Sequence, residues 1–429
     1  MDNDVILTNN EPSRIMMVTT EYPPMQGGVG KYSASLATSL RKCGLDVFVV
    51  CNEKGNGDFY GLSPFNSHNS EVLLNAVTKS KPDIVHVQYE PGLYGLVLDP
   101  INPTKINTNI DSFYARCKVP IITTFHSGYN FKQWISLATA TTRSKYKINR
   151  YPSYVVNLWK RLLNYRSSNS LNKEKSAMSA ASIFFSQYLS NMICGDGNIG
   201  SSNNNIPNHN HYCQVIYHGA KPYSNIISRP SKRDARAKFS LPEGPRIALA
   251  LGYKTATKGW DLFENMKIPD GWIIVANGSE NHYSKENVIL RFNKQEPRLV
   301  NLQTDFITDE DLSFLFYAAD ATILPYKVCS GSGVMFDGLA HGLPFVASDV
   351  GFFREFSSKG LGITVKREPA AFTHALKALD KNYEAYSERV CHFKGKLKWD
   401  VVAAQHASLY RLVTNADMGK LISPLLSAP

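Results

Sequence analysis

The sequence predicts an α/β protein in which two doubly wound, Rossmann-like domains face each other across a cleft. Short continuous apolar runs alternate with stretches of helical periodicity along most of the chain. A polar, proline-marked stretch at 222–245 separates these runs into two sets. The first run leads into a glycine-rich loop and a helix, which is how a doubly wound domain commonly opens. We therefore expect an N-terminal domain over 1–221, a C-terminal domain over 222–395, and a final segment, 396–429, that packs back on the first domain.

The first domain opens with the apolar strand Arg14–Thr20, the loop Glu21–Gly30 and a helix over Lys31–Cys43 that ends before Gly44. Short apolar runs of this kind are typical of buried parallel strands. Further strands of this half are predicted at Val47–Cys51, Ile84–Gln88, Ile121–Phe125, Ile183–Ser186 and Val215–Tyr217.

The second domain repeats the pattern, starting with the strand Ile247–Leu251. Helices are predicted at Asp309–Ala319 and Gly333–His341, and a last one at about Trp399–Val413. The other strands are predicted at Trp272–Ala276, Leu299–Leu302, Ala321–Leu324, Phe345–Ala347 and Gly362–Thr364. Ligands of such sheets bind beyond the carboxyl ends of the strands, and domain interfaces are preferred sites.

Two features of the second half predict a pocket for a nucleoside diphosphate. The loop that leaves Ile247–Leu251 begins at Gly252 and carries Lys254 and Lys258, two ammonium groups suited to phosphate. Taken alone, this loop could equally be a solvated turn, because exposed lysines and glycine loops are common.

The second feature is the helix predicted from Gly333, which Ser330 or Ser332 can cap. The positive end of a helix attracts an anion. Asp337 lies one turn into this helix, where a carboxylate suits sugar hydroxyls better than phosphate.

Composition limits the partners. The chain has 429 residues, 43% of them hydrophobic, and a net charge of +11, which favours anionic partners such as nucleotides, nucleic acid or a lipid surface. The charge does not form a recognised nucleic-acid module, so nucleic acid is not expected. No apolar run approaches the roughly eighteen residues that span a bilayer, and Met1–Asp4 does not resemble a signal peptide, so we expect a cytoplasmic protein.

Seven cysteines, an odd number scattered through the chain, favour reduced thiols over a disulfide framework. A zinc site at Cys194, His209, His211 and Cys213 is the alternative, but the spacing is irregular and no metal is predicted.

The segment 131–175 carries ten basic residues and a single acid, Glu174, interleaved with aromatic residues. Such a segment can lie on anionic lipid headgroups, which would allow peripheral contact with the inner face of a membrane. The other interpretation is a solvated helical excursion whose aromatics form a local core.

A series of motifs in characteristic order resembles one known family. They are Glu21–Pro24 with Gly27–Gly30, Pro82–Tyr89, Thr124–His126, Val215–Gly219, Gly252–Gly259, Ala319–Asp320 with Leu324–Pro325, and Asp337–Asp349. Together they are similar to the GT-B glycosyltransferases of the large retaining family four, over nearly everything from Arg14 to Leu412.

The resemblance implies a role for each matching residue. Gly27, Gly28 and Gly30 would approach the donor diphosphate, where only glycine lets the backbone come so close. His126 would face the donor sugar and the acceptor.

In the second domain, the resemblance implies that Lys254, in place of the usual Arg, and Lys258 neutralise the leaving diphosphate. Asp337 would bind the ribose. Two departures stand out: Cys329 replaces a glutamate that lies near the donor sugar, and His218 and Lys221 replace the Asn and Asp of an Asn-Gly-Val-Asp motif.

The expected function is transfer of a sugar from a GDP-, UDP- or ADP-linked donor to a hydroxyl of a glycan, lipid or small-molecule acceptor. The resemblance implies retention, and the lysines and the helix terminus would make a metal or other cofactor unnecessary. Two alternatives stay open: an epimerase or hydrolase on the same fold, and a nucleotide-sugar-binding protein without catalysis.

Overall fold

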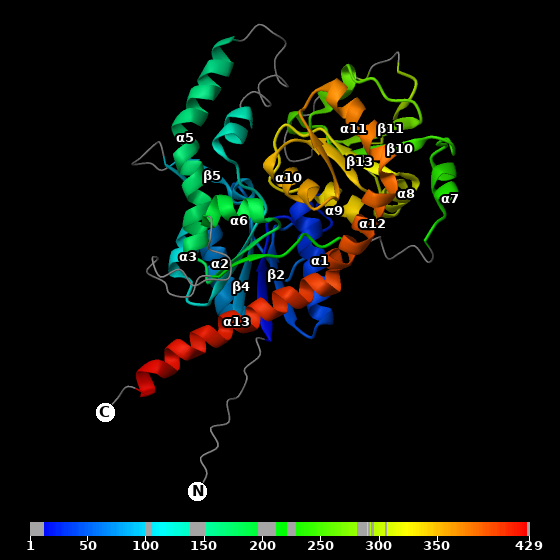
Figure 1. Ribbon diagram of the computed structural model, residues 1–429. Helices are drawn as coiled ribbons and strands as arrows, with labels where there is room; N and C mark the ends of the chain where they lie inside the picture. The colour runs from blue at the N-terminus through cyan, green and yellow to red at the C-terminus, as the bar shows by residue number, and fades with distance from the viewer. Residues whose placement is uncertain are drawn as a thin grey trace.

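Two parallel β-sheets form the centres of the two lobes seen in Figure 1. The computed structural model describes residues 13–98, 105–137, 151–195, 212–220, 229–280, 290, 292, 296–304 and 307–426. Every pairing within these two sheets is parallel, and helices connect most of the successive strands. This confirms the predicted α/β fold with two Rossmann-like units.

The first sheet has the strand order β3-β2-β1-β4-β7-β8-β9. Its strands are β1 (Arg14–Val18), β2 (Asp46–Cys51), β3 (Phe59–Tyr60), β4 (Ile84–Tyr89), β7 (Ile121–Phe125), β8 (Ala181–Phe184) and β9 (Tyr212–Val215). All six residues of β4, in the middle of the sheet, are buried, as expected for a parallel strand covered on both faces. The helices of this half are α1 (Gly28–Lys42), α2 (Asn69–Ser80), α3 (Asp111–Arg116), α5 (Tyr151–Ala177) and α6 (Gln187–Cys194), with a small hairpin of β5 (Leu96–Leu98) and β6 (Ile106–Thr108).

The second sheet has the order β12-β11-β10-β13-β14-β15. Its strands are β10 (Arg246–Tyr253), β11 (Trp272–Ser279), β12 (Leu299–Asn301), β13 (Ala321–Leu324), β14 (Phe345–Ser348) and β15 (Gly362–Val365). Around them lie α7 (Lys232–Lys238), α8 (Asp309–Ala318), α9 (Gly333–Ala340), α10 (Gly351–Ser358), α11 (Pro369–Lys381) and α12 (Tyr383–Phe393).

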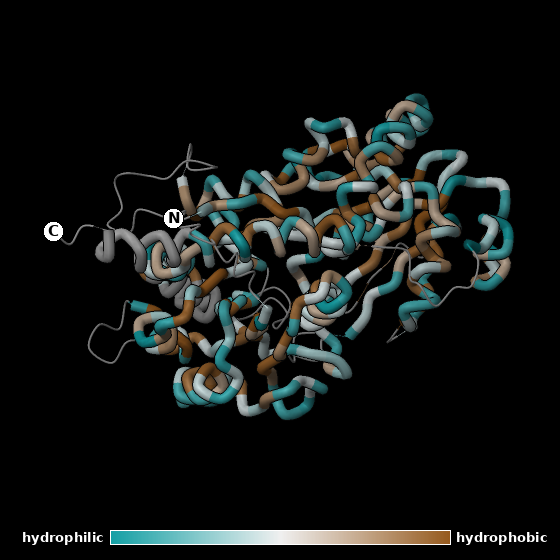
Figure 2. Tube along the Cα trace, turned by 90° about the horizontal axis from the view of Figure 1, so that it is seen from below, coloured by the Kyte–Doolittle hydropathy of each residue, from teal (hydrophilic) through white to brown (hydrophobic). Residues whose placement is uncertain are grey.

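The hydrophobic segments run through the middle of each lobe, while the outer helices and turns are largely hydrophilic (Figure 2). One buried apolar cluster contains residues of both halves, including Leu36 of α1, Phe336 of α9 and Val402. The two lobes therefore share part of their core.

The last helix, α13 (Trp399–Leu426), runs from the second lobe back beneath the first (Figure 1). Its buried His406 lies 3.5 Å, Nε2 to hydroxyl oxygen, from Tyr32 of α1. Among the described residues, no helix has both the length and the hydropathy needed to span a bilayer.

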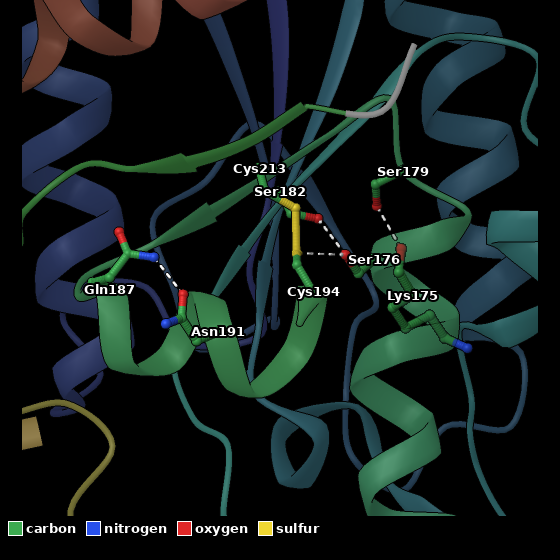
Figure 3. The surroundings of a disulfide bond; sticks show 8 residues. All are labelled: Lys175, Ser176, Ser179, Ser182, Gln187, Asn191, Cys194 and Cys213. Carbon is green, nitrogen blue, oxygen red and sulfur yellow. Dashed lines mark hydrogen bonds between the residues drawn. A yellow bond between two sulfur atoms is a disulfide. The ribbon is translucent and has the colours of Figure 1, made fainter. Parts of the chain in front are cut away.

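The expectation that all cysteines are reduced is wrong for one pair. Cys194, at the end of α6, and Cys213, on β9, form a disulfide (Figure 3). Their thiols are therefore not available as zinc ligands, while His209 and His211 lie outside the described residues. The two cysteines meet because α6 returns toward strand β9 in the sheet, which their spacing in the sequence does not reveal. The remaining five, Cys43, Cys51, Cys117, Cys329 and Cys391, are free thiols.

Candidate active site

A cavity of about 590 Å³ lies between the two lobes. In the first lobe its wall includes Glu90 and His126, which directly follow β4 and β7. In the second lobe it includes Tyr253 and Ser279, the last residues of β10 and β11. The cavity is thus at the carboxyl ends of both sheets, where ligands of such folds bind.

The structure brings most of the predicted site residues together at this cavity. Those that line it are Gly28, His126, Gly252, Lys258, Ser332, Gly333 and Asp337. Gly27, Gly30 and Lys254 are not among the lining residues.

Gly27 and Gly30 make room for a buried carboxylate. Glu21 is 5% exposed, and its Oε2 accepts a hydrogen bond of 3.4 Å from the Gly30 N–H at the start of α1. A Cβ on Gly27 would collide with this carboxylate, and a Cβ on Gly30 would crowd the Glu21 backbone. A Cβ on Gly28 would meet nothing within 4 Å. Of the three glycines, only Gly28 is placed to let a ligand approach.

Glu21 is also electrostatically unusual. Burial raises its pKa to about 7, against the opposing effect of the Gly30 N–H. Because this carboxyl occupies the N-terminus of α1, that terminus is not a free anion site.

Lys258 stands on a tightly held loop. The next residue, Gly259, has φ +75°, and a Cβ there would collide with the carbonyl oxygen of Pro325. Arg367 fixes the same turn, since it donates hydrogen bonds of 2.8 Å to the Pro325 carbonyl and 2.9 Å to the Gly259 carbonyl. The Lys258 ammonium lies 3.9 Å from the centroid of the Tyr326 ring.

Lys254, by contrast, is not among the residues that line the cavity. Its backbone N–H donates to the Ser279 carbonyl at 2.7 Å. Its Cγ lies beside β11, because a Cβ added to Gly278 would be 3.0 Å from it. The two lysines therefore do not share the wall of the cavity.

Helix α9 presents its N-terminus to the cavity. Ser332 is the N-cap and accepts a 3.2 Å hydrogen bond from the Met335 N–H, and Gly333 follows it. One turn further on, burial raises the pKa of Asp337 to about 7, with Lys31 opposing the rise and Asp309 adding to it. Lys31 of α1 and Asp309 of α8 form a 2.7 Å ion pair that joins the two lobes at the cavity.

His126 ends a buried hydrogen-bonded chain. Its Nε2 lies 3.0 Å from the Gln88 Oε1, and the Gln88 Nε2 lies 3.2 Å from the His86 Nε2. The His86 ring also contacts the hydroxyls of Thr124, at Nε2, and Tyr410 of α13, at Nδ1, both at 2.7 Å. Burial lowers the pKa of His126 to about 3, so the ring is neutral.

An amide oxygen only accepts and an amide nitrogen only donates, so the orientation of the Gln88 amide sets the tautomers of both histidines. If His126 donates from Nε2 to the amide oxygen of Gln88, the amide nitrogen donates to His86, whose Nδ1–H then donates to Tyr410. His126 is left with Nδ1 unprotonated, so it can accept a hydrogen bond from a ligand hydroxyl but cannot supply positive charge.

His218 and Trp399 bring aromatic rings to the wall of the cavity. His218 stacks on Phe336 with the ring planes 9° apart, and its Nδ1 lies 2.7 Å from the Gly219 carbonyl oxygen. Trp399, the first residue of α13, packs so closely on Gly219 that a Cβ there would strike the indole. His218, which replaces the asparagine expected from the resemblance, is thus part of the packing between lobes. Lys221 lies outside the described residues.

Cys329 is 4% exposed and does not line the cavity. Burial raises the pKa of its thiol to about 12, and its Sγ donates to the Gly331 carbonyl at 3.4 Å. The thiol cannot replace the charge of a glutamate.

Several lining residues were not predicted: Lys31, Tyr32, Glu90, Asn277 and Trp399. Lys31 and Glu90 could have been suspected, because one directly follows the glycine loop and the other directly follows a central strand. Nothing local marks Asn277 or Trp399.

No protein-family model matches the sequence, and no curated protein matches it either. Several solved structures are similar in fold. A sucrose-phosphate synthase from Thermosynechococcus elongatus has a TM-score of 0.64 at 16% identity, covering 94% of this chain and 100% of that one. HepE from Anabaena, in complex with UDP-glucose, has a TM-score of 0.56 at 12% identity, covering 95% and 99%. The catalytic domain of starch synthase IV from Arabidopsis thaliana, bound to ADP and acarbose, has a TM-score of 0.54 at 12% identity, covering 94% and 99%.

These likenesses extend over both lobes and over almost the full length of each relative. Together with the two facing parallel sheets, they show that the chain has the GT-B fold.

Proposed function

We propose that this protein transfers a sugar from a nucleoside diphosphate sugar to an acceptor hydroxyl. The observation that carries the proposal is the cavity between the lobes, to which the second lobe brings Lys258 and the N-terminus of α9 and the first lobe brings His126. Two proteins of the same fold were solved with UDP-glucose and with ADP and acarbose. Their ligands support a nucleotide in the interlobe cavity of this chain.

In this proposal the diphosphate lies between Lys258 and the amides at Ser332 and Gly333. Gly28 and Gly252 let the backbone come close to it. Asp337 accepts hydrogen bonds from the ribose hydroxyls. His126 accepts one from a hydroxyl of the donor sugar or the acceptor.

The proposed reaction keeps the configuration at the anomeric carbon. The bond between that carbon and the diphosphate oxygen breaks, the acceptor oxygen bonds to the same face, and the acceptor proton passes to the leaving diphosphate. Lys258 and the α9 terminus stabilise the negative charge that develops on the leaving group, so we propose that no metal takes part. Lys254 is not among the residues that line the cavity and is assigned a lesser role.

Cys329 is the observation that favours a second candidate, a nucleotide-sugar-binding protein without catalysis. An epimerase or hydrolase is distinguished by product analysis with the donor alone, because it consumes the nucleotide sugar without an acceptor.

We propose a peripheral membrane contact through 131–175 as a separate property. On α5, which extends well beyond the first sheet (Figure 1), Trp159 and Leu163 are each 60% exposed, and Leu162 is 41% exposed. Residues three and four apart share a helix face, and exposed Arg166 continues it. Replacing Trp159 and Leu163 by Ser should abolish cosedimentation with phosphatidylglycerol vesicles. Unchanged cosedimentation would contradict the contact.

Thermal denaturation with UDP, GDP and ADP, each with and without EDTA, tests the main proposal. At about 100 times its dissociation constant, a ligand of the native state stabilises by about 2.7 kcal/mol. We expect one diphosphate to raise the melting temperature clearly, equally with and without EDTA. No shift with any of the three would overturn the proposal, and a shift lost in EDTA would overturn metal independence.

A further inference from the structure

The interlobe cavity offers few positive charges to a diphosphate. Of the described residues that line it, Lys31 and Lys258 are the only lysines or arginines. Burial lowers the pKa of His126 to about 3 and that of His218 to about 4, so both rings are neutral. Lys254, which the sequence predicted as the second cation, does not line the cavity. The second cation of the wall is therefore Lys31, which comes from the first lobe.

Lys31 lies on the face of α1 that borders the cavity. It comes three residues after Gly28, and residues three apart share a helix face. Both residues line the cavity, and a Cβ on Gly28 would meet nothing within 4 Å. The Lys31 side chain is 43% exposed, and its ammonium stands on a flexible four-carbon stem. A ligand that approaches Gly28 is therefore within reach of this ammonium.

The Lys31 ammonium is held by a carboxylate of the other lobe. Its Nζ lies 2.7 Å from the Oδ1 of Asp309, whose side chain is 54% exposed. Exposed ion pairs of this kind contribute little net stability, because both charges are well solvated when they separate. A partner that carries more negative charge can therefore take Lys31 from Asp309.

The carboxylate of this pair remains stable when the lysine leaves it. Asp309 is the first residue of α8 and directly follows the N-cap, Thr308. The positive end of a helix stabilises a carboxylate in its first turn. Asp309 therefore stays ionised without Lys31 and can take the lysine back.

Both members of the pair lie close to the residue proposed for the ribose. Lys31 lowers the pKa of Asp337 and Asp309 raises it, against a larger rise from burial. A nucleotide whose ribose binds Asp337 brings its diphosphate near this pair. Each phosphate carries negative charge, and hydrogen bonds from an ammonium to phosphate are stronger than those between neutral groups.

We propose that Lys31 is the second cation that binds the donor diphosphate, and that Asp309 holds this lysine until the donor arrives. The nucleotide sugar takes the Lys31 ammonium from Asp309, while Lys258 and the α9 terminus bind the same diphosphate from the second lobe. When the product diphosphate leaves, Lys31 returns to Asp309. This inference rests on the proposed function, because it takes the interlobe cavity as the donor site.

Titration calorimetry of the full chain with pyrophosphate, UDP, GDP and ADP tests this exchange. Lys31→Gln should weaken the affinity for pyrophosphate and for the nucleotide that binds by about tenfold, the net effect of a lost hydrogen bond to phosphate and a lost ion pair. Asp309→Asn should strengthen the affinity by about two- to fivefold, because Lys31 no longer leaves a charged partner. Both side chains are about half exposed, so both variants should fold.

The double variant separates an exchange of partners from simple repulsion by Asp309. Independent charges change the affinity additively, so repulsion alone would give the same gain from Asp309→Asn with and without Lys31. The exchange predicts that this gain disappears in the Lys31→Gln background. Asp311→Asn is the matched control, because Asp311 lies in the same turn of α8 and pairs with Lys238 at 2.7 Å but does not line the cavity. It should bind like the wild type.

Three results would overturn the exchange and leave the donor site intact. They are unchanged affinity in Lys31→Gln, a gain from Asp309→Asn that persists without Lys31, and an equal gain from Asp311→Asn. Binding of pyrophosphate with the expected pattern, but of no nucleotide, would support the exchange and refute the proposed donor. If neither the wild type nor Asp309→Asn binds any of the four ligands, both proposals are refuted.

Discussion

At the scale of single residues, the two lysines that look alike in the sequence have different surroundings. Lys258 directly precedes the turn that Gly259 and Arg367 fix and lines the cavity, while Lys254, whose Cγ lies beside Gly278 of β11, does not line it. A charge-assisted hydrogen bond contributes about 1.5–3 kcal/mol, so Lys258→Ala should weaken nucleoside diphosphate binding by about tenfold or more. Lys254→Ala should have a smaller effect. Titration calorimetry measures both affinities, and equal losses would contradict the ranking.

Asp337 gives a second prediction at this scale, because its role in ribose binding depends on its charge. Asp337→Asn should weaken UDP binding and leave pyrophosphate binding nearly unchanged, since pyrophosphate has no ribose. The wild-type pKa is raised to about 7, so UDP affinity should rise with pH through about 7 as the carboxylate ionises. Calorimetry with both ligands across this range checks the expectation. A parallel loss for pyrophosphate would remove Asp337 from the ribose.

At the scale of elements, α13 connects the C-terminal segment to the candidate active site through Tyr410. Tyr410→Phe leaves the buried Nδ1–H of His86 without its 2.7 Å partner, and should reduce the free energy of unfolding by about 1–3 kcal/mol. Tyr60→Phe is the control, because Tyr60 also makes a hydrogen bond, of 2.7 Å to the Gly57 carbonyl, but is 47% exposed. Urea denaturation of both variants measures the difference, and similar losses would argue against a special role for the buried chain.

The strands were largely predictable from the sequence, and the reason is local. Buried parallel strands such as β4 and β10 are continuous apolar runs, which need no partner to be recognised. Helices α2, α3, α6, α7 and α10 to α12 were not predicted, since they fall in mixed polar stretches whose apolar residues pack only in the folded chain.

For the candidate site, the sequence predicted Lys258, Asp337 and His126, and all three line the cavity, because each lies just after a strand or in the first turns of a helix. It could not show that Glu21 occupies the glycine loop, because that depends on a side-chain direction. The ion pair between Lys31 and Asp309 could not be predicted from local sequence patterns either, because the two residues belong to different lobes.

At the scale of the whole molecule, the lobes are held together by parts that are distant in the sequence. The ion pair of Lys31 and Asp309, the 2.8 Å hydrogen bond from the Tyr188 N–H to Glu355, and the packing of Trp399 all cross between them. The ligand cavity and the shared apolar core are therefore built from the same two surfaces. Substitutions that change the packing at this interface should therefore change the affinity for nucleotides.

Buried ionisable groups around this interface and in the two cores make stability depend on pH, in two opposing directions. Five histidines have a pKa lowered by burial: His86, His126, His218, His341 and His406. Three carboxyls have a pKa raised by burial: Glu21, Glu90 and Asp337. The neutral histidines stabilise the fold above their unfolded pKa of about 6.5, and this contribution is lost as the pH falls. The carboxyls stabilise it below their unfolded pKa of about 4, and this contribution is lost as the pH rises toward 7.

Because the histidines are more numerous among the described residues, acidification should destabilise the protein. We expect the melting temperature without ligand to fall between about pH 7.5 and about pH 5, before most exposed carboxylates are protonated. His406→Gln removes one buried histidine away from the cavity wall and should make this decline shallower. A melting temperature that rises over the same interval would mean that the three carboxyls dominate, and that the histidines are less deeply desolvated than their burial indicates.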